Sequence, residues 1–216
     1  MRDTQMIQAI AIDGPAASGK TAIGKELAKS LGFVFLDTGL MYRAITFWAL
    51  EENIDLNDLR ALGELAQSKA KDAGEFALLG GSEILHSHAV GRHVSIVSRE
   101  SVVREPLVKQ QRIIAELGPI VMVGRDIGTI VLPSALKIFL EASQEVRTKR
   151  RLNELLEKGR IETSSSAGQE IEFRDELDSQ REISPLIAAP DAIKINTEEI
   201  GIAEVVLLIN KAIDDT

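Results

Sequence analysis

The chain has 216 residues, 44% of them hydrophobic and 27% charged, with a formal charge of −8. These proportions are typical of a globular enzyme with one sizeable core, and the acidic balance argues against non-specific nucleic-acid binding, which needs a basic surface. The sequence has no cysteine, no apolar run of membrane-spanning length and no signal-like N-terminal stretch, which excludes disulfides and cysteine metal sites and leads us to expect a cytoplasmic protein.

The first two predicted elements enclose a phosphate-binding motif. Ile7–Ile12 predicts a strand, and the apolar residues of Ala22–Leu31 recur at helical spacing. Between them lies a full G-x-x-x-x-G-K-[ST] phosphate loop, whose N–H groups and following helix N-terminus favour an anion. We expect Lys20 to reach the β- and γ-phosphates of ATP and the Thr21 hydroxyl to bind Mg²⁺. The expected ATP-binding residues are Gly14, Pro15, Ala16, Ala17, Ser18, Gly19, Lys20 and Thr21.

The alternative for this motif is a glycine-rich turn with an incidental lysine. The strand and the helix on either side disfavour it, because they are the context in which a real phosphate loop occurs.

The rest of the chain alternates predicted strands and helices. Further strands are predicted at 33–36, 120–123, 136–140 and 192–195. Helices are predicted at 40–50, 58–71, 94–117 with an interruption near Pro106, 143–158, 171–182 and 200–213. In the poorly patterned stretch 72–92 we expect a strand at 75–79 and a turn at 80–82, and we expect a mobile loop at 160–168. The alternation predicts an α/β fold with a mostly parallel sheet covered on both faces.

Charged or glycine-rich sequence follows four predicted strands, at Asp13-Gly14, 37–39, 124–126 and 141–143. Ligands of such sheets bind at the carboxyl ends of the strands, so we expect one shared site. Arginine suits phosphoryl transfer because its guanidinium is planar, always charged and bidentate. Arginines follow several of these strands: Arg43, Arg125, Arg147, Arg150 and Arg151.

Arg174, Asp178 and Arg181 share one helical face, because they are spaced i, i+4, i+7. They are candidates for binding a second anion. A surface ion-pair ladder, which contributes little energy, is the alternative.

Four blocks of the sequence resemble the bacterial cytidylate kinases, in order and at similar spacing. They are 10–15 leading into the phosphate loop; 36–39 with 41–44; 124–129 with Pro133; and Arg174-Asp175 with Asp178, Arg181, 184–186 and 191–192. The phosphate loop alone is shared by many families, but the four blocks together are specific. The resemblance implies a three-layer P-loop NTPase fold with a central parallel sheet. It also implies a single kinase domain over 1–216, with a short NMP-binding insertion at about 60–105 and a lid region at about 147–172.

The resemblance also implies roles for individual residues. The catalytic group would be Lys20, Arg125, Arg147, Arg151 and Arg181. The acceptor nucleotide would be bound by Thr38, Arg43, Ser95, Arg104, Arg125, Asp126, Arg174, Asp178 and Arg181. Within that set, Thr38 and Arg43 would contact the phosphate, Arg174 and Asp178 the ribose, and Asp126, Ser95 and Arg104 the cytosine edge.

The activity that this resemblance implies is ATP-dependent phosphorylation of CMP, and of dCMP, with Mg²⁺. The implied protein is a monomer without nucleic-acid or membrane partners. Two alternatives stay open: a P-loop kinase of another small acceptor such as UMP, and a non-catalytic nucleotide-binding switch. A switch has no reason to keep arginines around a second anion site.

Overall fold

The computed structural model describes residues 7–157, 163–181 and 183–215. In this part of the chain five parallel strands form one sheet in the order β2-β3-β1-β4-β5. The strands are β1 (Ala9–Asp13), β2 (Val34–Asp37), β3 (Ile120–Gly124), β4 (Leu136–Glu141) and β5 (Ile193–Asn196). Each of them overlaps one of the predicted strands, and the predicted parallel sheet is confirmed.

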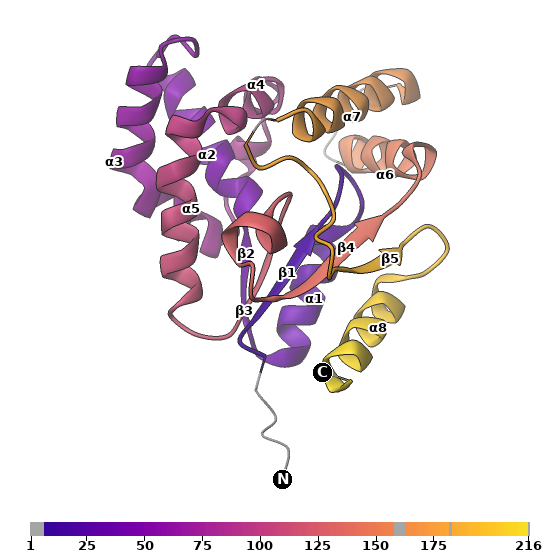
Figure 1. The fold of residues 1–216 in the computed structure, drawn as a ribbon. Coiled ribbons are helices and arrows are strands. Elements are labelled where there is room, and N and C mark those ends of the chain that lie inside the picture. Colours follow the sequence, from indigo (N-terminus) through magenta and orange to yellow (C-terminus); the bar gives the residue numbers. More distant parts are fainter. Residues whose placement is uncertain (1–6, 158–162, 182, 216) are drawn as a thin grey trace.

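Helices cover both faces of the sheet, which gives the predicted three layers (Figure 1). Successive strand residues point to opposite faces, so Ala11 and Met122 pack into one core while Ile12 and Val123 pack into the other. The first core is completed by α2 (Thr38–Glu51), α3 (Leu59–Leu78), α4 (His88–Arg99) and α5 (Ser101–Ala115). The second is completed by α1 (Lys20–Leu31) and α8 (Ile202–Asp214).

The predicted strand at 75–79 is wrong, because α3 continues to Leu78. A short apolar run does not by itself distinguish a strand from a helix. Packing decides here: Phe76 meets Trp48 of α2 edge-on, with ring centroids 6.4 Å apart. Glu83–His86 then forms a short 3₁₀ helix before α4.

The interruption predicted near Pro106 lies instead at Glu100, between α4 and α5. Glu100 has extended backbone angles and stands at the N-cap of α5. Pro106 lies inside α5, which loses one backbone hydrogen bond there but continues.

Helices α6 (Gln144–Glu157) and α7 (Ser164–Ser179) lie side by side beyond the carboxyl ends of the strands (Figure 1). The helix predicted from 171 begins earlier, at Ser164, because Thr163 and Ser166 cap it reciprocally. Ser166 N donates to Thr163 Oγ1 and Thr163 N donates to Ser166 Oγ, both at 3.1 Å. Residues 163–168 are therefore a cap and a first helical turn and not a loop, whereas 160–162 and Glu182 lie outside the described residues.

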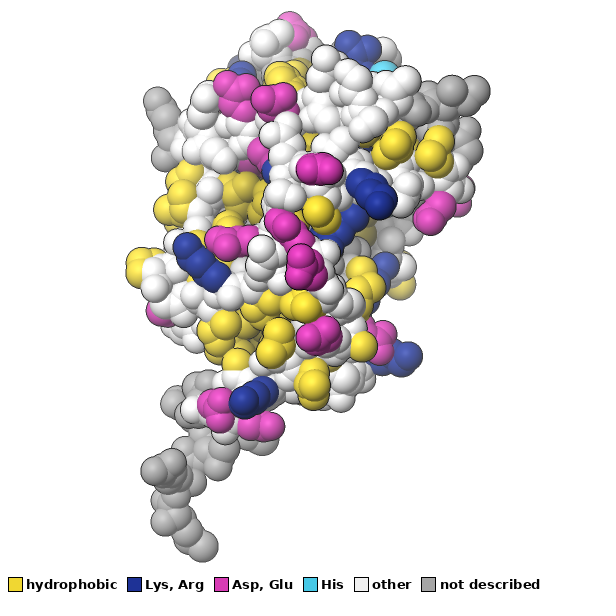
Figure 2. Space-filling model, turned by 90° about the vertical axis from the view of Figure 1, so that its right-hand side faces the viewer, with side chains coloured by type: hydrophobic (Ala, Val, Ile, Leu, Met, Phe, Trp, Pro, Cys, Tyr) yellow, Lys and Arg dark blue, Asp and Glu magenta, His cyan; other side chains and the backbone are white. Residues whose placement is uncertain are grey.

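Basic side chains stand singly among acidic ones on the face shown in Figure 2, with hydrophobic side chains between them. Within residues 7–157, 163–181 and 183–215, no helix is both long enough and apolar enough to cross a membrane.

Candidate active site

The phosphate loop leads from β1 into α1, as the sequence predicted, and α1 begins at Lys20. Two of its positions require glycine. Gly14 has φ +152°, and a Cβ there would lie 2.4 Å from the carbonyl oxygen of Leu140. Gly19 has φ +96° at the N-cap of α1. These angles fold the loop around the N-terminus of α1, where backbone N–H groups favour an anion.

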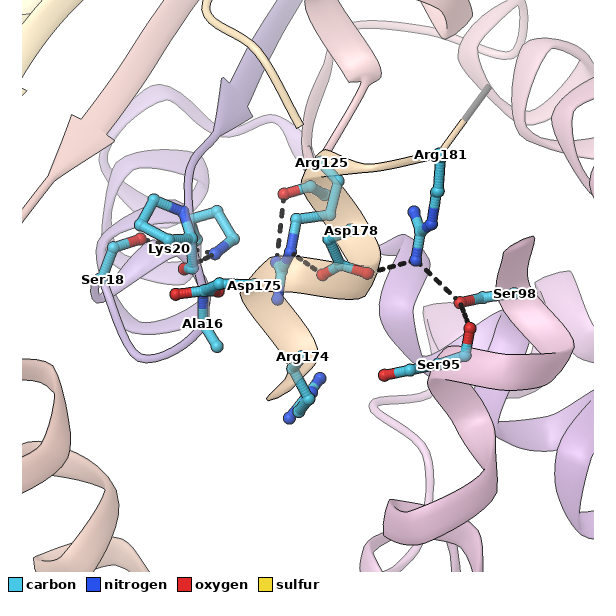
Figure 3. A network of polar contacts seen from close by, with 12 residues as sticks. Ala16, Ser18, Lys20, Ser95, Ser98, Arg125, Arg174, Asp175, Asp178 and Arg181 are labelled. Carbon is cyan, nitrogen blue, oxygen red and sulfur yellow. Dashed lines mark hydrogen bonds and ion pairs between the residues drawn. The ribbon is translucent and has the colours of Figure 1, made fainter. Parts of the chain in front are cut away.

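Lys20 is buried and turned back onto its own loop (Figure 3). Its Nζ donates to the Pro15 carbonyl oxygen at 2.6 Å and to Ser18 Oγ at 3.3 Å. Burial, followed by repulsion from Arg125, lowers the pKa of Lys20 well below its ordinary value. Both acceptors are neutral, so they hold the amine less strongly than an anion would. An incoming anion can therefore compete for its hydrogen bonds. Three carboxylates partly offset the pKa shift: Asp37, Asp13 and Asp175.

The carboxyl end of β2 meets the phosphate loop. Thr21 Oγ1 donates to Asp37 Oδ2 at 2.7 Å, and Asp37 Oδ1 accepts from Gly39 N at 3.0 Å as the N-cap of α2. Thr38 Oγ1 donates to the Val123 carbonyl oxygen at 2.9 Å. The sequence placed Asp37 in one of the strand-end segments of the expected site but assigned it no role.

A cavity of about 210 Å³ opens between this loop, the ends of β2 and β3, and helices α4 and α7. It brings together most of the predicted residues: Lys20, Thr21, Thr38, Arg43, Ser95, Arg104, Arg125, Asp126, Arg151, Arg174, Asp178 and Arg181. It is also lined by residues that sequence reasoning missed, among them Tyr42, Ser98 and Glu154. Tyr42 lies within the block 41–44 but was given no role, whereas Ser98 and Glu154 carry no motif signal and are placed here by the packing of α4 and α6.

A buried ion pair lines the cavity beside α4. Arg104 Nη2 donates to Asp126 Oδ2 at 2.5 Å, and Arg104 Nη1 donates to the Ser98 carbonyl oxygen at 3.0 Å. The Arg104 guanidinium lies over the Tyr42 ring, 5.2 Å from its centroid. The pair combines an acceptor and several donors in a site shielded from water, an arrangement suited to reading a polar ring edge.

A second set of charged side chains joins α7 to the end of β3 (Figure 3). Arg125 Nε donates to Asp178 Oδ2 at 2.8 Å, while Arg181 pairs with Asp178 and donates to Ser98 Oγ at 2.9 Å. Burial alone would raise the pKa of Asp178, but Arg125, Arg181 and Arg174 outweigh it and lower that pKa. The side chains of Arg181 and Asp178 are each 5% exposed, so this face is not a surface ladder.

Further arginines surround the same cavity. Arg43 Nη1 donates to the Leu85 carbonyl oxygen at 2.9 Å, and burial, then repulsion from Arg174 and Arg151, lowers the pKa of Arg43 to about 10. Arg151 is held by two carboxylates, Glu154 at 3.0 Å and Glu170 at 2.7 Å. Mutual repulsion among these cations makes the cavity a favourable place for phosphate groups.

Arg147 does not line the cavity. Its Nη1 donates to the Ala16 carbonyl oxygen at 3.2 Å and pairs with Asp175, and its Nε donates to the Ala142 carbonyl oxygen at 3.0 Å. The other oxygen of Asp175 accepts from Ala16 N at 3.0 Å. In this conformation Arg147 and Asp175 therefore hold α6 and α7 against the phosphate loop, whereas Arg147 was predicted to face the transferred phosphate.

The family model for cytidylate kinase matches residues 10–215. The chain belongs to the cytidylate kinase family. The cytidylate kinases of Bacillus subtilis (strain 168) and Geobacillus kaustophilus (strain HTA426) are each 44% identical to it over 215 residues, which cover 95% of this chain and 96% of theirs. That of Streptococcus uberis is 47% identical over 212 residues, 94% of each chain. Family membership confirms the resemblance that the four sequence blocks indicated.

Solved structures share the fold of this cytidylate kinase family member at low identity. Shikimate kinase from Bacteroides thetaiotaomicron aligns with a TM-score of 0.50 and 15% identity over 96% of this chain and 99% of that one. An uncharacterized protein from Eubacterium ventriosum aligns with a TM-score of 0.54 and 17% identity, over the same shares. These similarities support the P-loop NTPase fold alone.

Another residue of this family member that sequence reasoning did not assign is Asp13, buried at the end of β1. Its Oδ1 accepts from Ile127 N at 2.9 Å and its Oδ2 accepts from Gly128 N at 2.7 Å. Burial, which is the largest cause, raises the pKa of Asp13 to about 6 even though these two hydrogen bonds lower it.

We expect Asp13 to make the stability of the protein depend on pH. Its pKa of about 6 in the folded state lies above the ordinary 3.8, so the folded state binds this proton more tightly. That contribution is complete below pH 3.8 and is lost as the pH rises through about 6. Between about pH 4 and about pH 7, the unfolding free energy of the wild type should fall by up to about 3 kcal/mol relative to Asp13→Asn. Urea denaturation of both proteins at the two pH values measures this, and a pH-independent difference would contradict it.

Proposed function

We propose that this protein transfers the γ-phosphoryl group of ATP to CMP, and to dCMP, forming CDP or dCDP and ADP. The bond between the γ-phosphorus and its bridging oxygen to the β-phosphate breaks, and a bond from a phosphate oxygen of CMP forms. The observation that carries the proposal is a single cavity lined by the phosphate loop, by several arginines and by the buried Arg104–Asp126 pair. Membership of the cytidylate kinase family supports the same reaction.

The proposed roles divide the cavity between two substrates. ATP would bind along residues 14–21. The acceptor phosphate would be held by Thr38, Arg43, Arg125 and Arg181, the ribose by Arg174 and Asp178, and the cytosine by Ser95, Arg104 and Asp126. Because the acceptor phosphate is already an anion, no general base is needed. Catalysis then consists of positioning and charge stabilisation by Lys20, Arg125, Arg151 and Arg181, with Arg147 released toward the phosphate.

The residues beside Lys20 fit a magnesium ion. Thr21 Oγ1 and Asp37 Oδ2 are hard oxygen ligands 2.7 Å apart at the mouth of the phosphate loop. Mg²⁺ usually takes few protein ligands and completes its shell with water and phosphate oxygens. Thr21 would hold the ion with Asp37 beside it, and the bound ion would neutralise charge on the β- and γ-phosphates.

The arrangement of helices supports a division of the kinase domain. We assign the NMP-binding insertion, residues 60–105, to α3, α4 and the start of α5, because α4 contributes Ser95 and Ser98 to the cavity. The lid, residues 147–172, corresponds to α6 and the start of α7, because it contributes Arg151. We further propose a cytoplasmic monomer whose partners are ATP and CMP or dCMP, without nucleic acid or membrane.

An acceptor screen tests the proposal. ADP release from ATP is measured with CMP, dCMP, UMP, AMP and GMP in turn, and we expect CMP and dCMP to support the fastest release. Fast release with UMP alone would favour the other-acceptor kinase. ATP binding without ADP release for any acceptor would favour a nucleotide switch, which has no use for the buried arginines.

We expect the protein to prefer CMP over UMP by at least roughly tenfold in kcat/KM. An ionised Asp126 only accepts hydrogen bonds, so it favours the 4-amino group of cytosine and repels the corresponding carbonyl of uracil. Asp126→Asn should erode this preference, because an amide can also donate. Steady-state kinetics with both nucleotides measure the ratio of the two kcat/KM values. The control is Asp191→Asn, which removes an exposed carboxylate paired with Lys137 and should leave that ratio unchanged. Equal efficiencies for CMP and UMP in the wild type would contradict the role of Asp126.

A further inference from the structure

Asp13 directly precedes the phosphate loop, yet its carboxylate is bound to another segment. Both of its oxygens accept backbone N–H groups of the turn that follows β3, from Ile127 and Gly128. These groups lie at the start of the short π-helix Ile127–Val131, where N–H groups have no partner within the helix. The carboxylate therefore satisfies two buried donors and fixes the turn to the end of β1.

We propose that Asp13 is a positioning residue for the acceptor-nucleotide half of the site, and that it acts through the turn carrying Arg125 and Asp126. The inference rests on the proposed function, because that function assigns Arg125 and Asp126 to the acceptor nucleotide.

The chain is held on both sides of Arg125 and Asp126. Before them, Gly124 lies in β3 opposite Asp13, and a Cβ on Gly124 would lie 2.7 Å from the Ile127 side chain and from Thr38 Oγ1. After them, the two hydrogen bonds from Asp13 hold Ile127 and its neighbour at 2.9 and 2.7 Å. The directions of the Arg125 and Asp126 side chains are thereby determined.

These directions matter because both side chains make short, geometry-dependent contacts. Asp126 Oδ2 accepts from Arg104 at 2.5 Å, and Arg125 Nε donates to Asp178 at 2.8 Å. A shift of the turn by about 1 Å would exceed hydrogen-bonding distance for such pairs and misplace both side chains. The hydrogen bonds of Lys20 go instead to Pro15 and Ser18, so Asp13 is linked to Lys20 by the charge of its carboxylate and not through the turn.

No other side chain reproduces this arrangement. Asparagine has one acceptor oxygen, and its NH₂ group would face the second N–H donor. Glutamate keeps the charge and both oxygens, but its extra methylene in a buried site would displace the turn. The two variants therefore move the turn while differing in charge.

The test compares Asp13→Asn and Asp13→Glu with a matched control, Asp58→Asn. Asp58 also accepts two backbone N–H groups, from Arg60 and Ala61, but at the exposed N-cap of α3. We expect both Asp13 variants to raise the KM for CMP about tenfold and to reduce the CMP-over-UMP preference at least about threefold. The KM for ATP should stay within about twofold, and Asp58→Asn should match the wild type in all three quantities.

An equal rise in the KM values for ATP and CMP would overturn the inference, and so would an unchanged KM for CMP in either folded variant. If circular dichroism shows that Asp13→Asn is unfolded, Asp13→Glu decides, because it retains the buried charge. Calorimetric binding of CMP without ATP gives a second readout that does not depend on turnover. If the wild type phosphorylated a different acceptor, the proposed function would be refuted. The KM values for ATP and for that acceptor could still be compared in the Asp13 variants, so the two failures are distinguishable.

Discussion

Lys20→Ala is expected to lower turnover by roughly 10²–10³-fold while the fold survives. Nζ donates hydrogen bonds to the phosphate loop itself, at Pro15 and Ser18. Its removal therefore deletes a charge that we propose stabilises the transferred phosphate, and it does so without opening the apolar core. The lowered pKa of Lys20 shows that burial of its charge is unfavourable, so we expect unchanged or higher stability in the variant. Steady-state kinetics and thermal denaturation by circular dichroism measure the two effects.

Lys29→Ala is the matched control for this substitution. Lys29 is an exposed residue in the last turn of the same helix, α1, and its loss should leave turnover unchanged. Near-normal turnover in folded Lys20→Ala would refute the assignment of the phosphate loop as the ATP site.

Arg181→Ala is expected to reduce kcat/KM for CMP by about 10- to 100-fold, with little change in the affinity for ATP. The side chain is 5% exposed, joins Asp178 to Ser98 and lines the cavity where we propose the acceptor binds, so it is not on the solvent face. Its loss would remove the proposed charge-assisted contact to the acceptor, and it leaves Asp178 with one fewer partner. Kinetics with ATP and CMP varied separately would show which substrate is affected.

The control is Arg60→Ala, because Arg60 and Glu64 form a true surface ladder with side chains 88% and 68% exposed. This variant should leave kcat and both KM values unchanged and alter the free energy of unfolding by less than about 1 kcal/mol. If Arg181→Ala behaved in the same way, the proposed acceptor role of its helix face would be wrong.

The order of strands and helices was predictable because it depends on local patterns. Buried parallel strands such as Ile120–Gly124 form continuous apolar runs, and the phosphate loop has a fixed spacing. The errors occurred where tertiary packing decides. Phe76 and its neighbours fit a strand by composition, but the contact with Trp48 keeps them in α3. The early start of α7 depends on the Thr163–Ser166 cap, which has serine where the usual capping box has glutamate or glutamine.

Most predicted site residues share one cavity, because many of them belong to motifs at the carboxyl ends of strands or on the face of α7, while Ser95, Arg104 and Arg151 are contributed by α4, α5 and α6. Three acidic residues that organise this site were given no role from the sequence: Asp13, Asp37 and Asp175. Two of them have remote partners, since Ala16 is 159 positions from Asp175 and Ile127 is 114 positions from Asp13. Spacing within the sequence carries no information about such contacts. The different placement of Arg147 has the same origin, since Asp175 comes from the neighbouring helix α7.

The strand order has a consequence for how the chain folds. β1 pairs with β3 and β4, so Ala9–Asp13 has no sheet partner until the chain reaches residues 120–124. Helices α2 to α5 lie between these strands and pack against one another, and contacts between nearby segments form faster than those that close a long loop. In refolding followed by pulsed hydrogen exchange, we expect amides of α2–α5 to become protected before those of β1.

The phosphate loop is encoded within the first 21 residues, but it acquires its geometry late for the same reason. A nascent chain that ends before residue 120 should therefore not bind ATP.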